Sequence, residues 1–253
     1  MDETLEKVVA AGKKKARLSV LRMILFGVLA GAFIALAGVG ATFGNVYAGK
    51  IAGALIFPAG LAMVVVAGSE LFTGNNLMMM AMLRGEISVC EMLKNWGFVY
   101  LGNLIGVLIV SAFVVGGGVL DAVAETVVAT ANAKAGLDFL EAILRGVLCN
   151  FLVCVAVWMA FSANTVSGKI LAVFFPVMLF VLCGFEHSVA NMFYVPAGMM
   201  EGARMGMLTP TVAEFLVGNL LPVTIGNIIG GAGCVGVAYY LALQTGVDID
   251  KKA

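Results

Sequence analysis

The sequence predicts an all-α membrane protein with six transmembrane helices. Of its 253 residues, 62% are hydrophobic and 12% are charged, and the mean hydropathy is +1.06. A soluble globular domain has about 25% charged residues, so this composition excludes that class. The apolar residues fall into six long runs, and each is near or above the roughly 20 residues that a spanning helix needs.

The six runs are taken in chain order and cover residues 20–47, 52–82, 95–118, 138–162, 169–200 and 212–243. The charged segment before them has no apolar centre, so it is not a cleavable signal peptide, and we expect it to be helical. The second and fifth runs are unusually long, and a Gly-x-Glu segment interrupts each of them. We therefore expect the second and fifth helices to be broken, each into two half-helices around a non-helical stretch that faces protein or a water-filled cavity.

These runs form a single transmembrane domain over residues 1–253. We divide it into a cytoplasmic N-terminal segment, a first repeat, an outer connection, a second repeat and a cytoplasmic tail, at residues 1–19, 20–118, 119–137, 138–243 and 244–253. Eleven basic residues fall on one side of the predicted spans, and Lys50, Lys134 and Arg204 fall on the other. Because basic residues accumulate on the cytoplasmic side, both termini are predicted to be cytoplasmic.

The division into repeats follows from a motif that occurs twice. Residues 68–75 and 184–191 both read Gly-x-Glu-x-x-x-x-Asn, and Gly102-Asn103 in the third run corresponds to Gly226-Asn227 in the sixth. Each unit holds three spans, an odd number, so the second copy enters the membrane from the opposite side. Inverted repeats with interrupted helices place a permeation or substrate site near the midplane. The two interruptions should therefore face each other across one pathway.

His187 is the only histidine of the chain and lies in the second copy of the motif. Imidazole can donate a hydrogen bond to an anion and, with an ordinary pKa of about 6.5, can exchange a proton with a weak acid. We interpret His187 as a pathway residue, against the alternative of a buried packing residue. Thr73 occupies the equivalent region of the first copy, and its hydroxyl is expected to meet the His187 ring unless it bonds to its own backbone.

The carboxylates and amides of the motif are predicted to be structural. Glu70 and Glu186 would repel an anion, so we expect them to accept hydrogen bonds from backbone N–H groups at the interruptions, with a proton relay as the alternative. Amides in apolar spans usually cross-link helices or cap half-helices. That role is expected for Asn75, Asn191, Asn103, Asn219 and Asn227, whereas Asn150 in the fourth run is assigned to the neighbourhood of His187.

Further candidates are one cation and six apolar side chains. Lys134 lies in a polar stretch on the outer side, where it would attract anions or remain a solvated loop charge. Apolar rings in a pore exclude water and bare ions, and this role competes with ordinary core packing for Phe57, Leu61, Leu71, Phe72, Val153 and Phe180.

Other functional classes have no signature here. The chain contains no GxGxxG loop, Walker loop, nucleophile elbow or metal-ligand spacing, so we expect no enzyme, no cofactor and no metal site. Its net charge is zero, which gives no reason to expect a nucleic-acid partner. The scattered cysteines are interpreted as small buried hydrophobic residues, at positions 90, 149, 154, 183 and 234.

Five motifs together suggest a family. They are Glu70-Leu-Phe-Thr73-Gly-Asn75, Asn95-Trp96 with Gly102-Asn103-Leu, Cys149-Asn150-Phe-Leu-Val153-Cys, Gly184-Phe-Glu-His187-Ser-Val-Ala-Asn191-Met-Phe193 and Pro222-Val-Thr-Ile-Gly-Asn227. The chain resembles the formate/nitrite transporter family over essentially its whole length. The fourth motif and the Leu-Phe-Thr segment are the specific ones.

The resemblance implies an aquaporin-like six-span fold and a homopentamer in a prokaryotic plasma (inner) membrane, with one anion path in each protomer. It implies that His187 contacts Thr73, that Asn150 lies near the histidine and that Lys134 is a basic vestibule residue. It also implies an outer constriction at Leu61 and Phe180 with Phe57 nearby. The inner constriction would consist of Leu71, Phe72 and Val153.

The predicted function is a transmembrane channel or transporter for small monovalent weak-acid anions. Formate is the first candidate, and nitrite, hydrosulfide, acetate and lactate stay open. Passage is either proton-linked, with the neutral acid crossing the apolar rings, or a flow of the anion itself with His187 as hydrogen-bond donor. An aquaporin-type channel for water or small neutral solutes is the alternative from another class. The expected partners are the anion, membrane lipid and further copies of the chain.

Overall fold

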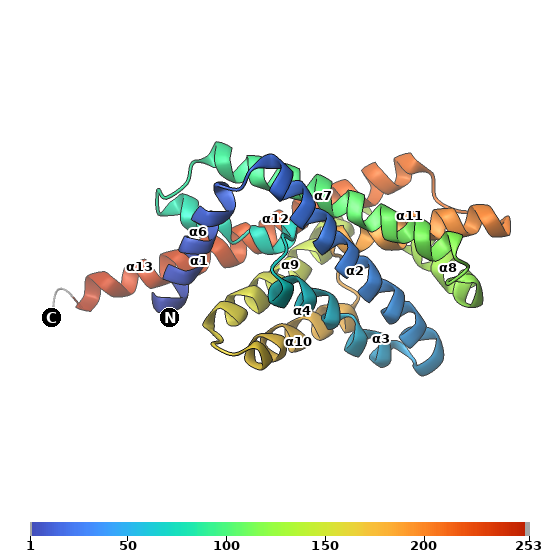
Figure 1. Ribbon diagram of the computed structural model, residues 1–253, viewed down its shortest axis with the longest axis horizontal. Coiled ribbons are helices and arrows are strands. Elements are labelled where there is room, and N and C mark those ends of the chain that lie inside the picture. Colours follow the sequence, from blue (N-terminus) through green and yellow to red (C-terminus); the bar gives the residue numbers. More distant parts are fainter. Residues whose placement is uncertain (1, 251–253) are drawn as a thin grey trace.

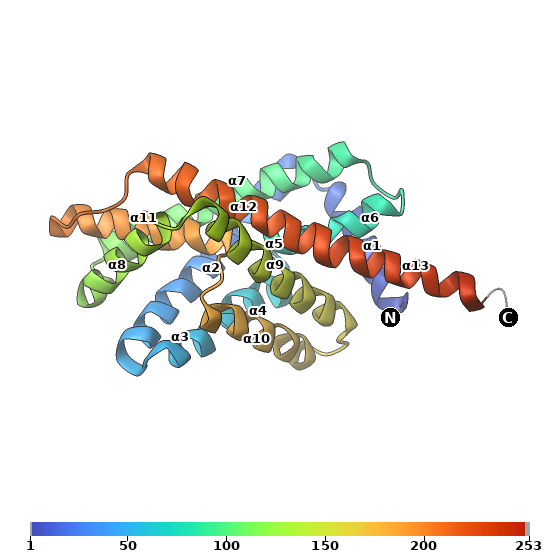
Figure 2. The same cartoon turned by 180° about the vertical axis from the view of Figure 1, so that it is seen from behind.

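The computed structural model describes residues 2–250, and it is helical throughout this range apart from short connections. Residues 251–253, the end of the predicted tail, lie outside the described residues. Helices α1 and α6 lie at one end of the long axis and α8 lies at the opposite end (Figure 1). The view from behind shows the same arrangement, with α13 extending toward the end that carries α1 (Figure 2). We call these two ends the α1 end and the α8 end.

The first half of the chain contains the helices α1 (Asp2–Ala16), α2 (Val20–Ala48), α3 (Lys50–Ile56), α4 (Pro58–Ala67), α5 (Phe72–Asn75), α6 (Met78–Leu83) and α7 (Val89–Gly116). A 3₁₀ turn, η1 (Asp121–Val123), and helix α8 (Ala124–Ala135) connect it to the second half. The second half contains α9 (Phe139–Ser162), α10 (Val166–Cys183), α11 (Ser188–Met205), η2 (Glu214–Leu220), α12 (Leu221–Ile228), η3 (Ile229–Val237) and α13 (Ala238–Asp250), where η2 and η3 are π-helical.

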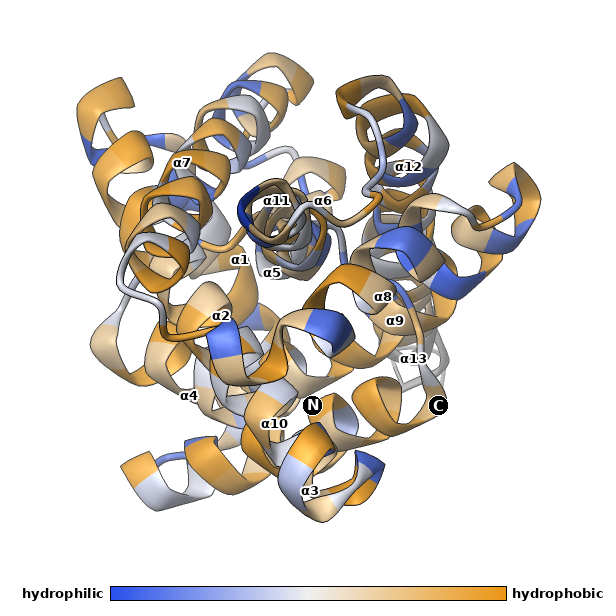
Figure 3. Cartoon of the chain, turned by 90° about the vertical axis from the view of Figure 1, so that its right-hand side faces the viewer, coloured by the Kyte–Doolittle hydropathy of each residue, from blue (hydrophilic) through white to orange (hydrophobic). Residues whose placement is uncertain are grey.

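Six helical stretches are long and apolar enough to cross a membrane. They are Val20–Ala48, Lys50–Ala67, Val89–Gly116, Phe139–Ser162, Val166–Cys183 and Glu214–Gln244. Most of their residues are hydrophobic (Figure 3), and many of the large hydrophobic side chains are exposed on the isolated chain. In the view along the long axis, α11 and α5 are surrounded by the other helices (Figure 3). The protein is an integral membrane protein with six spanning helices, as the composition predicts.

Local sequence explains where these helices begin. The side chains of Ser19, Asp138 and Thr165 accept hydrogen bonds from the first-turn backbone N–H groups of α2, α9 and α10. Ser88 and Glu91 form a reciprocal capping box at the start of α7. Because the first N–H groups of a helix have no partner within the helix, these side chains stabilise each start by about 1 kcal/mol.

Glycines allow the helices of each half to cross closely. A Cβ atom on Gly106 of α7 would lie 2.0 Å from the carbonyl oxygen of Val28 in α2. A Cβ atom on Gly230, where α12 continues into η3, would lie 2.1 Å from the carbonyl oxygen of Val147 in α9. Such distances leave room for hydrogen alone, so the α2–α7 and α9–η3 crossings both require glycine.

Three regions differ from the expectations. The outer connection 119–137 is mostly helical, because it contains η1 and α8. Residues 244–250 of the predicted tail continue α13. Cys90, Cys183 and Cys234 are exposed on the isolated chain, and Cys149 and Cys154 alone are buried, so the interpretation of all five as buried residues was wrong. An apolar face that meets lipid in a membrane accommodates small hydrophobic side chains as well as a core does, and the sequence pattern does not distinguish the two.

Candidate functional site

Two non-helical segments interrupt the helices in the middle of the molecule. Residues 68–71 join α4 to α5, and residues 184–187 join α10 to α11. The helix before each segment ends at a glycine in the left-handed region, Gly68 with φ 78° and Gly184 with φ 73°. Glycine adopts this conformation without the penalty of a Cβ atom. The glycine of each Gly-x-Glu motif therefore fixes the residue at which its helix ends.

Asn103 of α7 holds the first non-helical segment in place. Its Nδ2 atom donates to the carbonyl oxygens of Gly27 and Glu70, both at 2.9 Å, and its Oδ1 accepts from the backbone N–H of Phe72 at 3.0 Å. The side chain is fully buried. It thus satisfies the N–H of Phe72 and the carbonyl of Glu70 at the non-helical segment, and ties them to the carbonyl of Gly27 within α2.

Asn227 of α12 makes the same three bonds at the second segment. Its Nδ2 atom donates to the carbonyl oxygens of Gly146 and Glu186, both at 2.9 Å, and its Oδ1 accepts from the backbone N–H of Ser188 at 2.9 Å. Each bonded group corresponds in position to a partner of Asn103. The two segments are therefore anchored to their own halves by equivalent contacts.

Thr73 and His187 meet between these two segments. The hydroxyl oxygen of Thr73 lies 2.9 Å from Nε2 of His187. Thr73 has no exposed surface and His187 is 3% exposed, so bulk water does not compete for this hydrogen bond. The contact joins the start of α5 to the start of α11 and brings together two residues that the sequence analysis assigned to the pathway.

The other ring nitrogen of His187 determines where the proton of the imidazole lies. Nδ1 accepts a hydrogen bond from the backbone N–H of Ala190 at 3.0 Å, so His187 is the N-cap of α11. A nitrogen that accepts carries no proton, and the neutral ring must then carry its proton on Nε2. Nε2–H donates to Thr73, which leaves the hydroxyl hydrogen of Thr73 free to donate to a third group.

Aromatic rings line one side of the histidine. The Phe180 ring is stacked on the imidazole, with centroids 5.9 Å apart and an interplanar angle of 11°. Phe57 contacts Phe180 edge to face at 5.9 Å, and Tyr194 stacks on Phe57 at 6.5 Å. Phe57, Phe180 and the nearby Leu61 of α4 are each 3% exposed. Phe57 and Phe180 thus belong to one buried aromatic cluster, whereas Leu61 lines a cavity at the α1 end together with Leu71.

The residues assigned to the inner constriction are divided between two environments. Leu71 lines a cavity at the α1 end, and Val153 is 1% exposed. The ring of Phe72 instead packs edge to face against Trp96 and Tyr100 of α7, with centroids 6.0 and 4.8 Å apart. Phe72 therefore connects the start of α5 to the helix that carries Asn103.

A lysine completes a set of polar contacts around Glu70. Nζ of Lys15, in α1, donates to Oε2 of Glu70 at 2.9 Å and to Oδ1 of Asn75 at 2.8 Å. Nδ2 of Asn75 donates to Oε2 of Glu70 at 2.7 Å and to Oδ1 of Asn95 at 2.8 Å. Nδ2 of Asn95 returns to the backbone carbonyl of Lys15 at 3.2 Å. We call Lys15, Glu70, Asn75 and Asn95 the Lys15 ring.

The second half builds the same set at the α8 end. Nζ of Lys134, in α8, donates to both carboxylate oxygens of Glu186 at 2.9 and 3.0 Å. Nδ2 of Asn191 donates to Oε2 of Glu186 at 2.6 Å and to Oδ1 of Asn219 at 2.8 Å, and Nδ2 of Asn219 donates to the carbonyl oxygen of Lys134 at 2.8 Å. We call Lys134, Glu186, Asn191 and Asn219 the Lys134 ring. A lysine paired with a glutamate therefore lies toward each end of the molecule.

The structure gives Lys134 and Asn150 more specific positions than the sequence did. The side chain of Lys134 is 17% exposed and its charge is balanced by Glu186, so it is not an isolated solvated cation. Nδ2 of Asn150 lies 3.3 Å from the carbonyl oxygen of Thr73 and 2.7 Å from that of Asn227. Asn150 thus bonds to backbone carbonyls of both halves, and among the described residues it forms no hydrogen bond with the imidazole.

Lys15 and Asn95 were not predicted to be site residues. Lys15 is one of several basic residues in a charged helix, and nothing in that helix distinguishes it. A signal was present in the repeat: Lys15 and Lys134 are separated by an offset of 119 residues, close to the 116 that separates Glu70 from Glu186. Alignment of the two halves beyond the apolar runs would have paired the two lysines.

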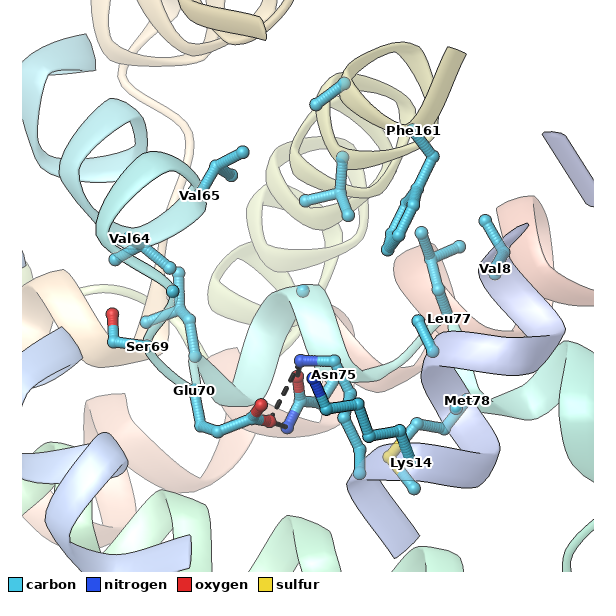
Figure 4. Close-up of a pocket in the computed structure, with 18 of the residues that line it drawn as sticks. Val8, Lys14, Val64, Val65, Ser69, Glu70, Asn75, Leu77, Met78 and Phe161 are labelled. Carbon is cyan, nitrogen blue, oxygen red and sulfur yellow. Dashed lines mark hydrogen bonds and ion pairs between the residues drawn. The ribbon is translucent and has the colours of Figure 1, made fainter. Parts of the chain in front are cut away.

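A cavity of about 390 Å³ lies between the Lys15 ring and the helices of the α1 end, and we call it the α1 cavity. Figure 4 shows Glu70 and Asn75 bonded on one side of it, with Val64, Val65 and Phe161 across from them. Lys14 of α1 and Lys169 of α10 also line it. The α1 cavity therefore has an apolar wall and a basic wall.

The described residues contain no group of three or more histidine, cysteine, aspartate and glutamate side chains that could hold a metal ion. The chemistry that the central site offers is hydrogen-bond donation from a neutral Thr73–His187 pair inside an apolar surrounding.

A family model described as formate/nitrite transporter matches residues 2–241. An uncharacterized transporter of Bacillus subtilis, YrhG, is 40% identical over 95% of this chain and 92% of its own length. The formate channel FocA of Haemophilus influenzae is 41% identical over 83% of both chains, and that of Escherichia coli is 36% identical over 91% of this chain and 90% of its own.

Solved structures give the same result. A structure described as an FNT family ion channel superimposes with a TM-score of 0.86 at 31% identity and covers 96% of this chain and 99% of the other. A pentameric formate channel with formate bound superimposes with a TM-score of 0.77 at 34% identity and covers 89% of this chain and 98% of the other.

Proposed function

The chain belongs to the formate/nitrite transporter family, whose members matched here are channels and transporters rather than enzymes, and on this premise we propose that it carries small monovalent weak-acid anions across a membrane. Formate is the substrate we propose first, because several relatives are named formate channels. Nitrite, hydrosulfide, acetate and lactate share its single negative charge and are likewise the anions of weak acids. The observation that carries the proposal is the buried Thr73–His187 hydrogen bond beside an apolar aromatic cluster.

Desolvation is the main obstacle to passage. Moving a carboxylate-sized ion from water into a low-dielectric surrounding costs on the order of 20 kcal/mol in the idealised limit, and several kcal/mol after relaxation. The buried apolar side chains of Phe57, Leu61 and Phe180 present such a surrounding. An anion that takes up a proton before it reaches these side chains avoids most of the cost, because desolvation favours the neutral form of an acid.

We propose that the central pair acts on the substrate as a neutral hydrogen-bond donor. Nε2–H of His187 donates to Thr73, and the Thr73 hydroxyl donates its free hydrogen to a substrate oxygen. Protonation of Nδ1 would remove the cap of α11 and place two N–H groups against each other at Ala190. The proton of a proton-linked passage therefore reaches the substrate from water in a vestibule, and the anion-channel alternative uses the same donor without that proton.

The charged rings fit the approach of an anion to either mouth. Lys15 and Lys134 come from opposite ends of the molecule, and each lysine is held by a glutamate and shielded by asparagines. A balanced pair attracts an anion less than a free lysine does and holds it less tightly. Rapid release is what a conducting pathway requires.

We infer that residues 20–118 and 138–243 are inverted copies. The support is the equivalence of Asn103 with Asn227, of the Lys15 ring with the Lys134 ring, and of the glycine crossings in each half. We further propose a homopentamer with one path in each protomer and an aquaporin-like arrangement of the spans. The α1 end would face the cytoplasm of a prokaryotic cell, with the protein in the plasma membrane.

Reconstitution into proteoliposomes tests the proposal. Formate should equilibrate faster than in protein-free vesicles, and acidification of the vesicle interior should accompany it if passage is proton-linked. Formate flux without proton movement would support the anion-channel alternative. Vesicles that pass water or glycerol but not formate would contradict the proposal and favour a neutral-solute channel.

A further inference from the structure

The α1 cavity carries more positive than negative charge. Its charged lining residues are Lys14 and Lys15 of α1, Lys169 of α10 and a single carboxylate, Glu70. Lys15 is bonded to Glu70 at 2.9 Å. Within residues 2–250, the side chains of Lys14 and Lys169 form no ion pair and no hydrogen bond. Lys14 is exposed and Lys169 is half-buried, and among the described residues no carboxylate balances either charge.

A polar group in the cavity wall also has no partner. Ser69 lies in the non-helical segment next to Glu70, as Figure 4 shows, and is 8% exposed. Its hydroxyl is buried and neither donates nor accepts a hydrogen bond among the described residues. A buried hydroxyl without a partner is destabilising by about 1–3 kcal/mol, and a side-chain rotation that lets it donate to an acceptor in the cavity would remove that penalty.

The helix that supplies Lys14 is anchored on several sides. Lys13 and Arg84 pair with Glu86 and Glu6, which fixes α1 against the α6–α7 region. The hydroxyl of Thr4 lies 3.0 Å from that of Ser162 at the end of α9. Because α1 is held at three points, the backbone that carries Lys14 is positioned before any ligand arrives, which lowers the entropic cost of binding.

We propose that the α1 cavity binds a divalent oxyanion. Two uncompensated ammonium groups match two negative charges, and the energy of each charge pair adds to the binding. A volume of about 390 Å³ exceeds what a one-carbon anion fills. The proposal rests on the proposed function, because it places this site at the mouth of the anion path.

A divalent anion bound there would block the path. The cost of desolvating an ion rises with the square of its charge, so a divalent anion is excluded by the apolar surrounding far more strongly than formate. Leu61, Val64 and Leu71 form the apolar wall of the cavity. A divalent anion therefore enters from the α1 end, stays in the cavity, and slows the passage of monovalent substrates from that side.

Sulfate is a suitable probe, because it stays divalent at every working pH and does not cross as a neutral acid. We expect sulfate on the α1 side of oriented proteoliposomes to slow formate flux, and sulfate on the α8 side at equal ionic strength to leave it unchanged. The double variant Lys14→Gln/Lys169→Gln should raise the half-inhibiting sulfate concentration by about tenfold or more. Lys94→Gln makes the same charge change at the start of α7, outside the cavity, and should retain full inhibition.

Succinate in place of sulfate distinguishes a dicarboxylate from a tetrahedral oxyanion, and inhibition by either one supports the site. Inhibition from both sides, inhibition that the double variant leaves intact, or no inhibition by either anion would overturn it. Binding is measured independently as a sulfate-dependent rise in the unfolding temperature of the purified protein. If sulfate raises the unfolding temperature of the unmodified protein but not that of the double variant, the site is supported even if the protein carries no formate. If the protein carries formate but sulfate neither raises its unfolding temperature nor inhibits flux, the proposed site is wrong and the proposed function still holds.

Discussion

Oγ1 of Thr73 and Nε2 of His187 lie 2.9 Å apart, although the two residues are separated by 114 positions in the sequence. The opposite nitrogen of the same ring caps α11 through the N–H of Ala190. One side chain therefore serves both the helix that positions it and the residue with which it acts. Structure and transport can be separated experimentally because the two nitrogens have different partners.

Thr73→Val is expected to reduce formate flux without unfolding the protein. Valine has nearly the same shape as threonine, and the change removes the hydroxyl that we assign to the substrate. A hydrogen bond is worth about 0.5–1.5 kcal/mol to a neutral acceptor and about 1.5–3 kcal/mol to a charged one, so flux should fall by roughly two- to tenfold for a neutral acid and by roughly ten- to a hundredfold for the anion. The matched control is Thr42→Val, since the Thr42 hydroxyl is buried and bonds to the carbonyl of Gly38 in its own helix. Normal flux in the Thr73 variant would count against the paired site.

His187→Asn and His187→Ala should have different consequences for stability and the same consequence for flux. Asparagine is a good N-cap residue, whereas alanine loses the cap and about 1 kcal/mol of stability. Neither side chain reaches Thr73 as imidazole does, so both variants should lose flux. The measurements are the unfolding temperature of the purified protein and the formate flux over a range of pH. If His187→Ala kept the flux and pH dependence of the unmodified protein, His187 would have no role in passage.

Glu186→Gln should be strongly destabilising, because it leaves the ammonium of Lys134 without a counter-charge. Removing one partner of a buried pair costs about 3–5 kcal/mol, and the two side chains are 17% and 5% exposed. The double variant Lys134→Gln/Glu186→Gln should recover part of this loss. Glu125→Gln, at an exposed position of α8, is the control and should leave the unfolding temperature unchanged. An equal loss in the single and double variants would show that the ion pair is not the cause.

Gly106→Ala is predicted to disrupt the α2–α7 crossing. The added Cβ atom would lie 2.0 Å from the carbonyl oxygen of Val28, a backbone atom that cannot rotate away. Overpacking of this kind typically costs about 1–3 kcal/mol. Gly97→Ala changes the same residue type in the same helix where no other atom lies within 4 Å, so it should be tolerated. Thermal unfolding of the two purified variants provides the comparison.

Phe180→Ala should widen the aromatic cluster beside His187. The ring stacks on the imidazole and contacts Phe57, so its loss leaves a space that water can enter. We expect glycerol permeability, measured by light scattering, to increase relative to formate flux. Phe113→Ala removes the same ring from an exposed position of α7 and should leave both rates unchanged. No change in the selectivity of the Phe180 variant would exclude this ring from the pathway.

Composition and long apolar runs were sufficient to predict six spans, although the second and fifth runs, 52–82 and 169–200, extend beyond the spans Lys50–Ala67 and Val166–Cys183. The predicted run 138–162 corresponds to α9, Phe139–Ser162, and the run 20–47 to α2, Val20–Ala48. These boundaries can be predicted from the sequence because every residue of a span loses contact with water, so polar residues mark where the span ends. The helical connection α8 was not predicted, since short polar helices depend on neighbouring contacts more than on intrinsic preference.

Only some of the site residues could be predicted from the sequence, for a related physical reason. Glu70 and Glu186 were identified because a carboxylate is rare in an apolar run, and this rarity can be seen in the sequence alone. Lys15 lies among other lysines, so its distinction arises only from the 2.9 Å contact with Glu70 that the fold creates. The packing of Phe72 against Trp96 and Tyr100 is likewise a property of the folded chain.

The triple bonding of Asn103 and Asn227 has a consequence for how related sequences can diverge. Aspartate at these positions lacks both N–H donors of the amide, and glutamine places the amide one methylene farther from the backbone. Any apolar residue loses all three hydrogen bonds at once. No single replacement reproduces what either asparagine does. Both positions should stay invariant among relatives whichever anion they carry, and the differences that define each substrate must be sought at residues that support no backbone.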